Sequence, residues 1–168
     1  FTEVRYLGHQ KQLQALHLIP EIAKVFQDVF GRETGGLVHP YRTENAETMI
    51  VALGSINGTI KDVVDAMRES GTAIGSIGVC SFRPFPLEAL AKALDGAKRV
   101  IVVEKSLAPG LGGMLTSDVR MSLLRQAIPV HTVIAGLGGR PVTGVSLTAA
   151  FELAVNDQLE DVHFLDLD

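Results

Sequence analysis

The stretch Thr48-Met49-Ile50-Val51-Ala52-Leu53-Gly54-Ser55 decides the fold class of this chain. Its first six residues form a nearly continuous apolar run, which is typical of a strand buried on both faces of a sheet. Apolar side chains then recur at the spacing of one helical face, at Ile60, Val63, Val64 and Met67. A buried strand followed by an amphipathic helix predicts a βα unit, and therefore a mostly parallel sheet.

The same alternation continues on both sides of this unit. Further strand-like runs begin near residues 73, 99 and 130, each followed by a helix-like segment. Such βα repeats predict helices on both faces of the sheet, joined by right-handed crossovers. Residues 37–42 could add an edge strand. Residues 20–30 predict an amphipathic helix with Pro20 as its first residue.

Composition excludes several classes of protein. The 168 residues suit one domain, and 46% of them are hydrophobic, which is enough for a core. The net charge is −4 and no Lys/Arg run exceeds two residues, so we expect no nucleic-acid partner. We expect no membrane partner, because no apolar stretch approaches the ~18 residues of a spanning helix.

Cys80 is the one cysteine of the chain. It excludes a disulfide framework, a cysteine-based zinc site and an iron–sulfur cluster held by this chain alone. It also indicates a reducing, cytoplasmic location. Because Cys80 ends an apolar run, we expect a small buried side chain rather than a nucleophile.

Neither catalytic residues nor metal ligands can be nominated from the sequence. The five histidines lack the spacings of common metal sites, and His131, beside a strand, is expected to be a core imidazole. No nucleophile elbow is present either.

Candidate functional loops follow the strands, because ligands of open parallel sheets bind at the carboxyl ends of the strands. In the loop of residues 54–59, Gly54 and Ser55 could present backbone N–H groups to an anion, or could merely form a tight turn. In the loop of residues 104–113, a close backbone approach to a phosphate or a neighbouring chain is possible at Gly110, Gly112 and Gly113.

Glu104 ends one of the expected core strands, and three roles are open to it. It could act as a general base, cap the next helix, or pair with Arg83 or Lys105. The structural roles are favoured.

Two other loops offer contact residues. Residues 81–86 contain two prolines and two phenylalanines, which favours a rigid joint or a contact surface over catalysis. Arg83 and Phe85 are therefore interface candidates. In residues 135–143, Arg140 could bind a carboxylate or phosphate, or form an interdomain ion pair.

Five segments, in this order and spacing, carry a family resemblance. They are Gly31-Arg32, Tyr41-Arg42-Thr43-Glu44-Asn45-Ala46-Glu47, Ala52-Leu53-Gly54-Ser55, Phe82-Arg83-Pro84-Phe85-Pro86 and Ala135-Gly136-Leu137-Gly138-Gly139-Arg140-Pro141-Val142-Thr143. Over roughly residues 25–151 the chain resembles the second domain of the alpha subunit of pyruvate:ferredoxin and related 2-oxoacid:ferredoxin oxidoreductases. The segment of residues 82–86 is most similar to the pyruvate-type enzymes.

The resemblance implies a transketolase C-terminal-like fold, which is three-layered (α/β/α) around a mixed, mostly parallel sheet of five strands. Residues 37–42 would be its antiparallel strand. The whole enzyme would oxidatively decarboxylate a 2-oxoacid, with pyruvate favoured, to its acyl-CoA and reduce ferredoxin. Thiamine diphosphate, Mg²⁺ and iron–sulfur clusters would be held by other parts of that enzyme and none by this chain alone.

A division of the chain follows from this interpretation. Residues 1–19 would connect to a preceding domain, residues 20–156 would form the domain, and residues 157–168 would be a tail. Because residue 1 is Phe, we expect a piece of a longer protein. The piece would be inactive alone and would serve domain packing and subunit assembly. Its own partners would be other domains or subunits of the enzyme. Ferredoxin and CoA would be partners of the whole enzyme.

Two expectations remain beside this one. A substitution of Arg83 by Glu should weaken assembly rather than unfold the domain. Alternatively, the chain is a stand-alone α/β module that binds a nucleotide, CoA or a small anion at its glycine-rich loops.

Overall fold

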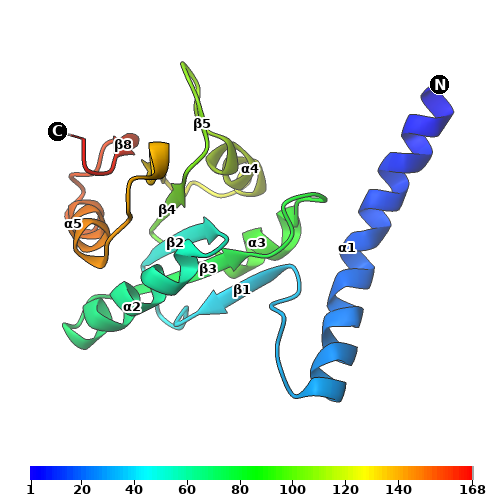
Figure 1. The fold of residues 1–168 in the computed structure, drawn as a ribbon, viewed down its shortest axis with the longest axis horizontal. Coiled ribbons are helices and arrows are strands. Elements are labelled where there is room, and N and C mark those ends of the chain that lie inside the picture. The colour runs from blue at the N-terminus through cyan, green and yellow to red at the C-terminus, as the bar shows by residue number, and fades with distance from the viewer. Residues whose placement is uncertain (168) are drawn as a thin grey trace.

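A six-stranded sheet with helices on both faces forms the body of the protein (Figure 1). The computed structural model describes residues 1–167. The strand order is β1-β3-β2-β4-β7-β8, and all neighbours are parallel except β1 and β3. The strands are β1 (Val38–Tyr41), β2 (Thr48–Leu53), β3 (Ile74–Val79), β4 (Arg99–Glu104), β7 (Val130–Ile134) and β8 (Val162–Phe164). A small separate hairpin is formed by β5 (Leu107–Ala108) and β6 (Gly112–Gly113).

Four helices cover the sheet and a fifth extends from it. They are α1 (Thr2–Phe30), α2 (Ile56–Glu69), α3 (Leu87–Ala93), α4 (Met114–Ser122) and α5 (Gly144–Val155), with a short 3₁₀ turn η1 (Leu137–Gly139) before α5. Apolar residues of α2 and α5 belong to one core cluster, and those of α3 and α4 to the other. The three-layer α/β/α fold with a mostly parallel mixed sheet and an antiparallel β1 is therefore confirmed.

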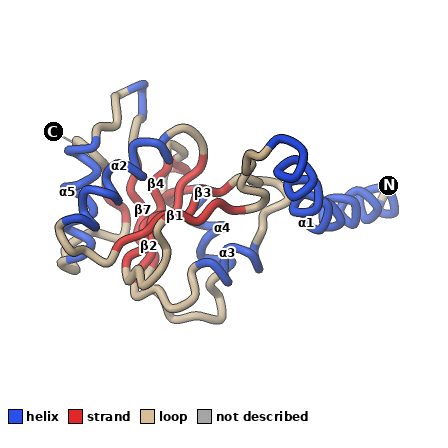
Figure 2. Tube along the Cα trace, turned by 90° about the horizontal axis from the view of Figure 1, so that it is seen from below, coloured by secondary structure: helices blue, strands red, loops and turns tan. Residues whose placement is uncertain are grey.

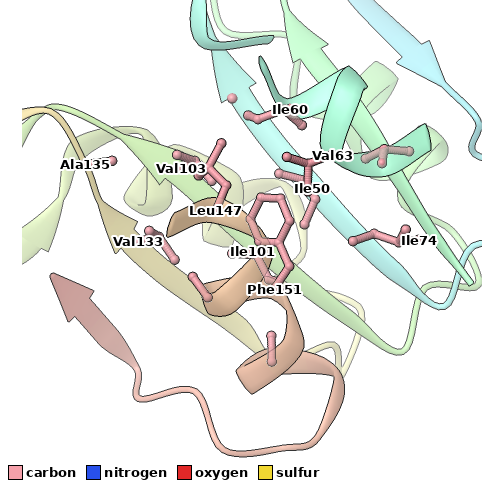
Figure 3. Packing of buried hydrophobic residues seen from close by; sticks show 14 of the residues in the cluster. Ile50, Ile60, Val63, Ile74, Ile101, Val103, Val133, Ala135, Leu147 and Phe151 are labelled. Carbon is pink, nitrogen blue, oxygen red and sulfur yellow. The ribbon is translucent and has the colours of Figure 1, made fainter. Parts of the chain in front are cut away.

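The two central strands are buried on both faces, which explains their continuous apolar sequence. Along β2, Ile50 and Ala52 enter the α2/α5 cluster, whereas Met49 and Val51 enter the α3/α4 cluster. Strand β4 divides its residues between the two clusters in the same way. On the α2/α5 side, Phe151 projects from α5 among side chains of several elements (Figure 3).

The number of strands was expected to be five, and this expectation was wrong. Residues 157–168 were expected to be a tail, yet they contribute β8, which pairs in parallel with β7. The core also receives Leu159 and Leu165, which lie on either side of β8. A strand of three residues is too short to produce a recognisable hydrophobic period. Its pairing with β7 is a tertiary effect.

The first helix also begins earlier than expected. Helix α1 has 29 residues, and Pro20, expected to be its first residue, lies inside it. The residues before Pro20 include three Gln and four Leu, which favour helix strongly enough to continue it through a residue that cannot donate to the carbonyl four positions back. No residue of α1 is buried, and the helix extends away from the sheet in both views (Figures 1 and 2).

None of the helices in the described part of the chain combines the length and the apolarity that crossing a bilayer requires.

The central role of Phe151 leads to a stability prediction. We expect Phe151→Ala to lower the free energy of unfolding by about 3–5 kcal/mol, because it leaves a cavity where a fully buried ring packs. Chemical denaturation followed by circular dichroism measures this change. Val145→Ala on the same helix is the matched control, since Val145 is 82% exposed. An equal effect of both substitutions would contradict the proposed core.

Candidate functional site

The loops after β2, β4 and β7 meet at the carboxyl edge of the sheet and enclose an open cavity of about 390 Å³. The crossovers that leave β2 and β4 lead to opposite sides, so the crevice between these strands is the switch point of the sheet. Ligands of open α/β sheets bind at such switch points. The cavity walls include Ser55 after β2, Lys105 after β4, and Gly136 and Arg140 after β7.

Ser55 lies at this cavity, whereas Gly54 lines a neighbouring one together with Asn57 and Cys80. Gly54 has a φ of +86°, a conformation that favours glycine and turns the chain from β2 into α2. Ser55 occupies the N-cap position of α2, but its side chain makes no capping hydrogen bond. The turn is closed instead by Asn57, whose side-chain amide donates to the Gly54 carbonyl at 2.9 Å.

The three glycines of the third loop lie elsewhere, in the hairpin of β5 and β6. Gly110 is at its exposed tip, and Gly112 and Gly113 form β6 and are buried. A Cβ atom at Gly113 would overlap the carboxylate of Glu104. The hairpin glycines therefore permit a close approach between parts of this chain. These glycines do not lie beside Gly54.

Glu104 caps the helix that follows the hairpin. Its carboxylate accepts hydrogen bonds from the backbone N–H groups of Leu115 and Thr116 and from the Thr116 hydroxyl, each at 2.8 Å. Thr132 of β7 donates in turn to the Thr116 hydroxyl at 2.9 Å. A buried carboxylate at a helix N-terminus satisfies donors that have no partner within the helix. Of the three roles considered, capping is the one that the structure shows.

Arg83 is engaged within its own domain. Its guanidinium forms an ion pair with Asp118 of α4 at 2.8 Å and lies 4.2 Å from the centroid of the Phe82 ring. The Arg83–Pro84 peptide bond is cis, and the Ser81 hydroxyl donates to the Pro84 carbonyl. Phe85 packs edge-on against Phe82 and partly enters the α3/α4 cluster. The loop is thus tied to its own domain by an ion pair and by ring packing, and more than half of the Arg83 side chain stays exposed.

Arg140 lies at the rim of the cavity and contacts the C-terminal part of the chain. One of its guanidinium nitrogens donates to the backbone carbonyl of Asp166. The fourth loop is therefore connected to the segment that continues from β8.

Cys80 is exposed, so the expectation of a buried side chain was wrong. Strand β3 ends one residue earlier, at Val79, and Cys80 falls in the loop that follows. Partial removal of water from the thiol raises the pKa of Cys80, only partly offset by the positive charge of Lys61. The thiol is consequently protonated at neutral pH and is not an activated nucleophile.

The histidines do not gather into a site. His131 is partly exposed on β7, with its Nδ1 atom 3.3 Å from the Glu160 carbonyl, rather than in the core as expected. Among residues 1–167, no group of three His, Cys, Asp or Glu residues is arranged to hold a metal ion.

Sequence reasoning missed the cations that organise the segment of residues 41–47. Arg68, in the last turn of α2, donates to the carbonyls of Arg42, Glu44 and Ile74 at 2.6–2.8 Å. Asp65 accepts from the Tyr41 hydroxyl and pairs with the Arg42 side chain. Only tertiary structure brings these partners together, so no local pattern could have revealed them.

The fold is shared with a known class of domain. A solved split-gene transketolase, described as an inactive beta4 tetramer, is similar with a TM-score of 0.53 and 23% identity, over 67% of this chain and 39% of that one. The architecture is thus that of transketolase C-terminal-like domains.

The family follows from the sequence itself. Residues 46–146 match the family described as pyruvate:ferredoxin oxidoreductase core domain II. The chain therefore belongs to this family.

Curated relatives agree with this assignment. "Pyruvate synthase subunit PorA" of Thermotoga maritima is 40% identical over 161 residues, covering 92% of this chain and 41% of that protein. The protein of the same name from Methanosarcina barkeri is 39% identical, covering 90% of this chain and 39% of that protein. The chain thus spans about two fifths of the length of these relatives.

The capping role of Glu104 can be tested by one substitution. We expect Glu104→Gln to lower the free energy of unfolding by about 1–3 kcal/mol, because the new amide N–H₂ cannot accept from the N–H groups of α4. Thermal or chemical denaturation measures the change. Glu152→Gln is the control, since this exposed carboxylate on α5 should leave stability nearly unchanged. Unaltered stability of Glu104→Gln would contradict the capping role.

Proposed function

We propose that the chain is a non-catalytic domain of a thiamine-dependent 2-oxoacid:ferredoxin oxidoreductase and serves domain packing and subunit assembly. Family membership and the pyruvate synthase relatives support this proposal, with pyruvate as the oxoacid. The whole enzyme would convert the oxoacid to its acyl-CoA and reduce ferredoxin in the cytoplasm. Other domains or subunits of that enzyme would be the direct partners of this chain, which would be inactive alone.

The donor atoms of this chain do not fit the cofactors of such an enzyme. An iron–sulfur cluster requires several cysteine thiolates, and the chain has only Cys80. Within residues 1–167, no group of three His, Cys, Asp or Glu residues is arranged to hold a metal ion. We therefore assign thiamine diphosphate, Mg²⁺ and the clusters to parts of the enzyme outside this chain.

One observation carries the assembly role: an apolar stripe on α1 that no part of the domain covers. Leu18, Ile22, Val25 and Val29 recur at the spacing of one helical face, and their exposed fractions lie between 53% and 67%. We call these four residues the α1 stripe. An exposed apolar surface of this kind marks an interaction site.

The α1 stripe points away from the domain. The residues of α1 beside the body are Pro20, Ala23, Lys24 and Gln27, which line a cavity together with residues 33–40. At 3.6 residues per turn, these four positions lie on the opposite side of the helix from the α1 stripe. Burying the α1 stripe therefore requires other protein. We propose that α1 as a whole joins this domain to the remainder of its enzyme.

The α1 stripe provides the main test. We expect the double substitution Ile22→Asp with Val25→Asp, made in the complete enzyme, to abolish assembly, because two charges cannot be buried without partners. The stability of the domain should not change, since neither residue is buried in it. Size-exclusion chromatography with light scattering measures assembly.

A matched control places the same charges on the polar face of α1. His17→Asp with Gln10→Asp adds two carboxylates about a quarter-turn or more away from the α1 stripe. This variant should assemble normally. Normal assembly of the Ile22→Asp, Val25→Asp variant would overturn the proposed role of α1.

Arg83 allows a second, independent test. Arg83→Glu should weaken assembly, yet it also places a carboxylate against Asp118. The exchange Arg83→Glu with Asp118→Arg restores an internal ion pair while the exposed charge stays reversed. We expect assembly to remain weak in the exchanged variant, as native gels or light scattering would show. Recovery of assembly would mean that Arg83 acts only by holding its own loop.

A further inference from the structure

The cavity at the switch point continues into a second one. The first, of about 390 Å³, and the second, of about 290 Å³, share walls formed by Leu53, Val103, Glu104 and Lys105. Each alone is near the lower limit of known small-molecule sites, which span roughly 300–1,000 Å³. Together they offer room for a ligand with two chemically distinct parts.

The first cavity is cationic and polar. Lys105 and Arg140 line it together with the hydroxyl-bearing residues Ser55 and Thr59. This concentration of positive charge occurs in a chain whose net charge is −4. The side-chain stem of Lys105 lies beside Gly136, so that the ammonium group belongs to the space between the loops after β4 and β7.

The charge of Lys105 is not neutralised inside the domain. Within residues 1–167, Lys105 takes part in no ion pair. The carboxylate of its neighbour Glu104 is directed to the N-terminus of α4, where three donors occupy its oxygens. Arg140 adds a permanent positive charge and also donates to the Asp166 carbonyl.

The second cavity is largely apolar. Phe82, Met114 and Leu53 line it, and each of them is exposed by 40–43%. These side chains come from the loop after β3, the start of α4 and the end of β2. Such partly exposed apolar side chains beside a cationic pocket form a suitable binding surface for an aromatic or aliphatic group.

We propose that the joined cavities bind a small organic anion. Its phosphate or carboxylate group is held by Lys105 and Arg140, and its apolar part packs against Phe82 and Met114. Lys105, which lines both cavities, contacts the ligand where its two parts meet. The proposal stands independently of the assembly role, because it uses the carboxyl edge of the sheet and not α1.

Titrations followed by amide NMR of the ¹⁵N-labelled chain test this proposal, since the chain has a core on both faces of its sheet. The probes are phenyl phosphate, benzoate, inorganic phosphate and uncharged benzyl alcohol. We expect phenyl phosphate or benzoate to shift the amides of Ser55, Lys105 and Gly136. The tighter of these two identifies the preferred head group. Inorganic phosphate and benzyl alcohol, which each carry only one part, should bind at least about tenfold more weakly.

Two variants separate the contributions. Lys105→Gln should weaken binding of the preferred anion by about tenfold or more, as expected for loss of a hydrogen bond to a charged group. Lys92→Gln, which removes the same charge from an exposed position on α3, should have no effect. Met114→Gln should weaken the binding of phenyl phosphate and leave the affinity for inorganic phosphate unchanged.

Four results would overturn the proposal. The first is absence of saturable binding of either aromatic anion up to about 10 mM, the range of the weakest specific affinities. The second is an equal loss in the Lys105→Gln and Lys92→Gln variants. The third is equal affinity for phenyl phosphate and inorganic phosphate, which would show that the apolar cavity contributes nothing to binding. The last is a set of amide shifts confined to residues outside the loops after β2, β3, β4 and β7 and the start of α4, which would place the anion elsewhere.

Discussion

Burial of β2 and β4 on both faces is the constraint on which the rest of the structure depends. Successive side chains of each strand enter opposite core clusters, so the interior positions of both strands, between Thr48 and Leu53 and between Arg99 and Glu104, are all apolar. The first charged side chain after the interior of β4 is that of Glu104, at its last position. All chemistry available to this sheet is therefore displaced to the loops at its carboxyl edge.

The two helix N-termini near that edge differ because of Glu104. At α4, its carboxylate occupies the donors that an external anion would need. At α2, Ser55 makes no capping hydrogen bond, and the cations Lys105 and Arg140 line the cavity beside it. One helix start is thus satisfied from within the chain, whereas the other faces an open cavity. This asymmetry is why we propose a ligand at the cavity beside α2 rather than at the glycine-rich hairpin.

The parts of the fold that were predictable from sequence are those whose burial is periodic. Strand β2 has the predicted bounds, and the buried residues of α2 are the four that formed the helical stripe. Strand β8, the exposed position of Cys80 and the contacts of Arg68 were not predictable. Each depends on tertiary pairing, such as that of β8 with β7 or of Arg68 with Arg42, or on the residue at which a strand ends. At the candidate site, the sequence indicated Ser55 and Arg140, but only folding adds Lys105 to them, and Gly54 lies at a neighbouring cavity.

The core and the exposed α1 stripe use separate sets of apolar residues in this chain. The core residues lie in the two clusters on either side of the sheet, and α1 contributes none of them. The α1 stripe therefore adds little to the free energy of folding of the domain, yet it exposes apolar surface that water disfavours. Covering that surface is favourable only when other protein is present, so the assembly role that we propose for α1 does not require any change in how the domain folds.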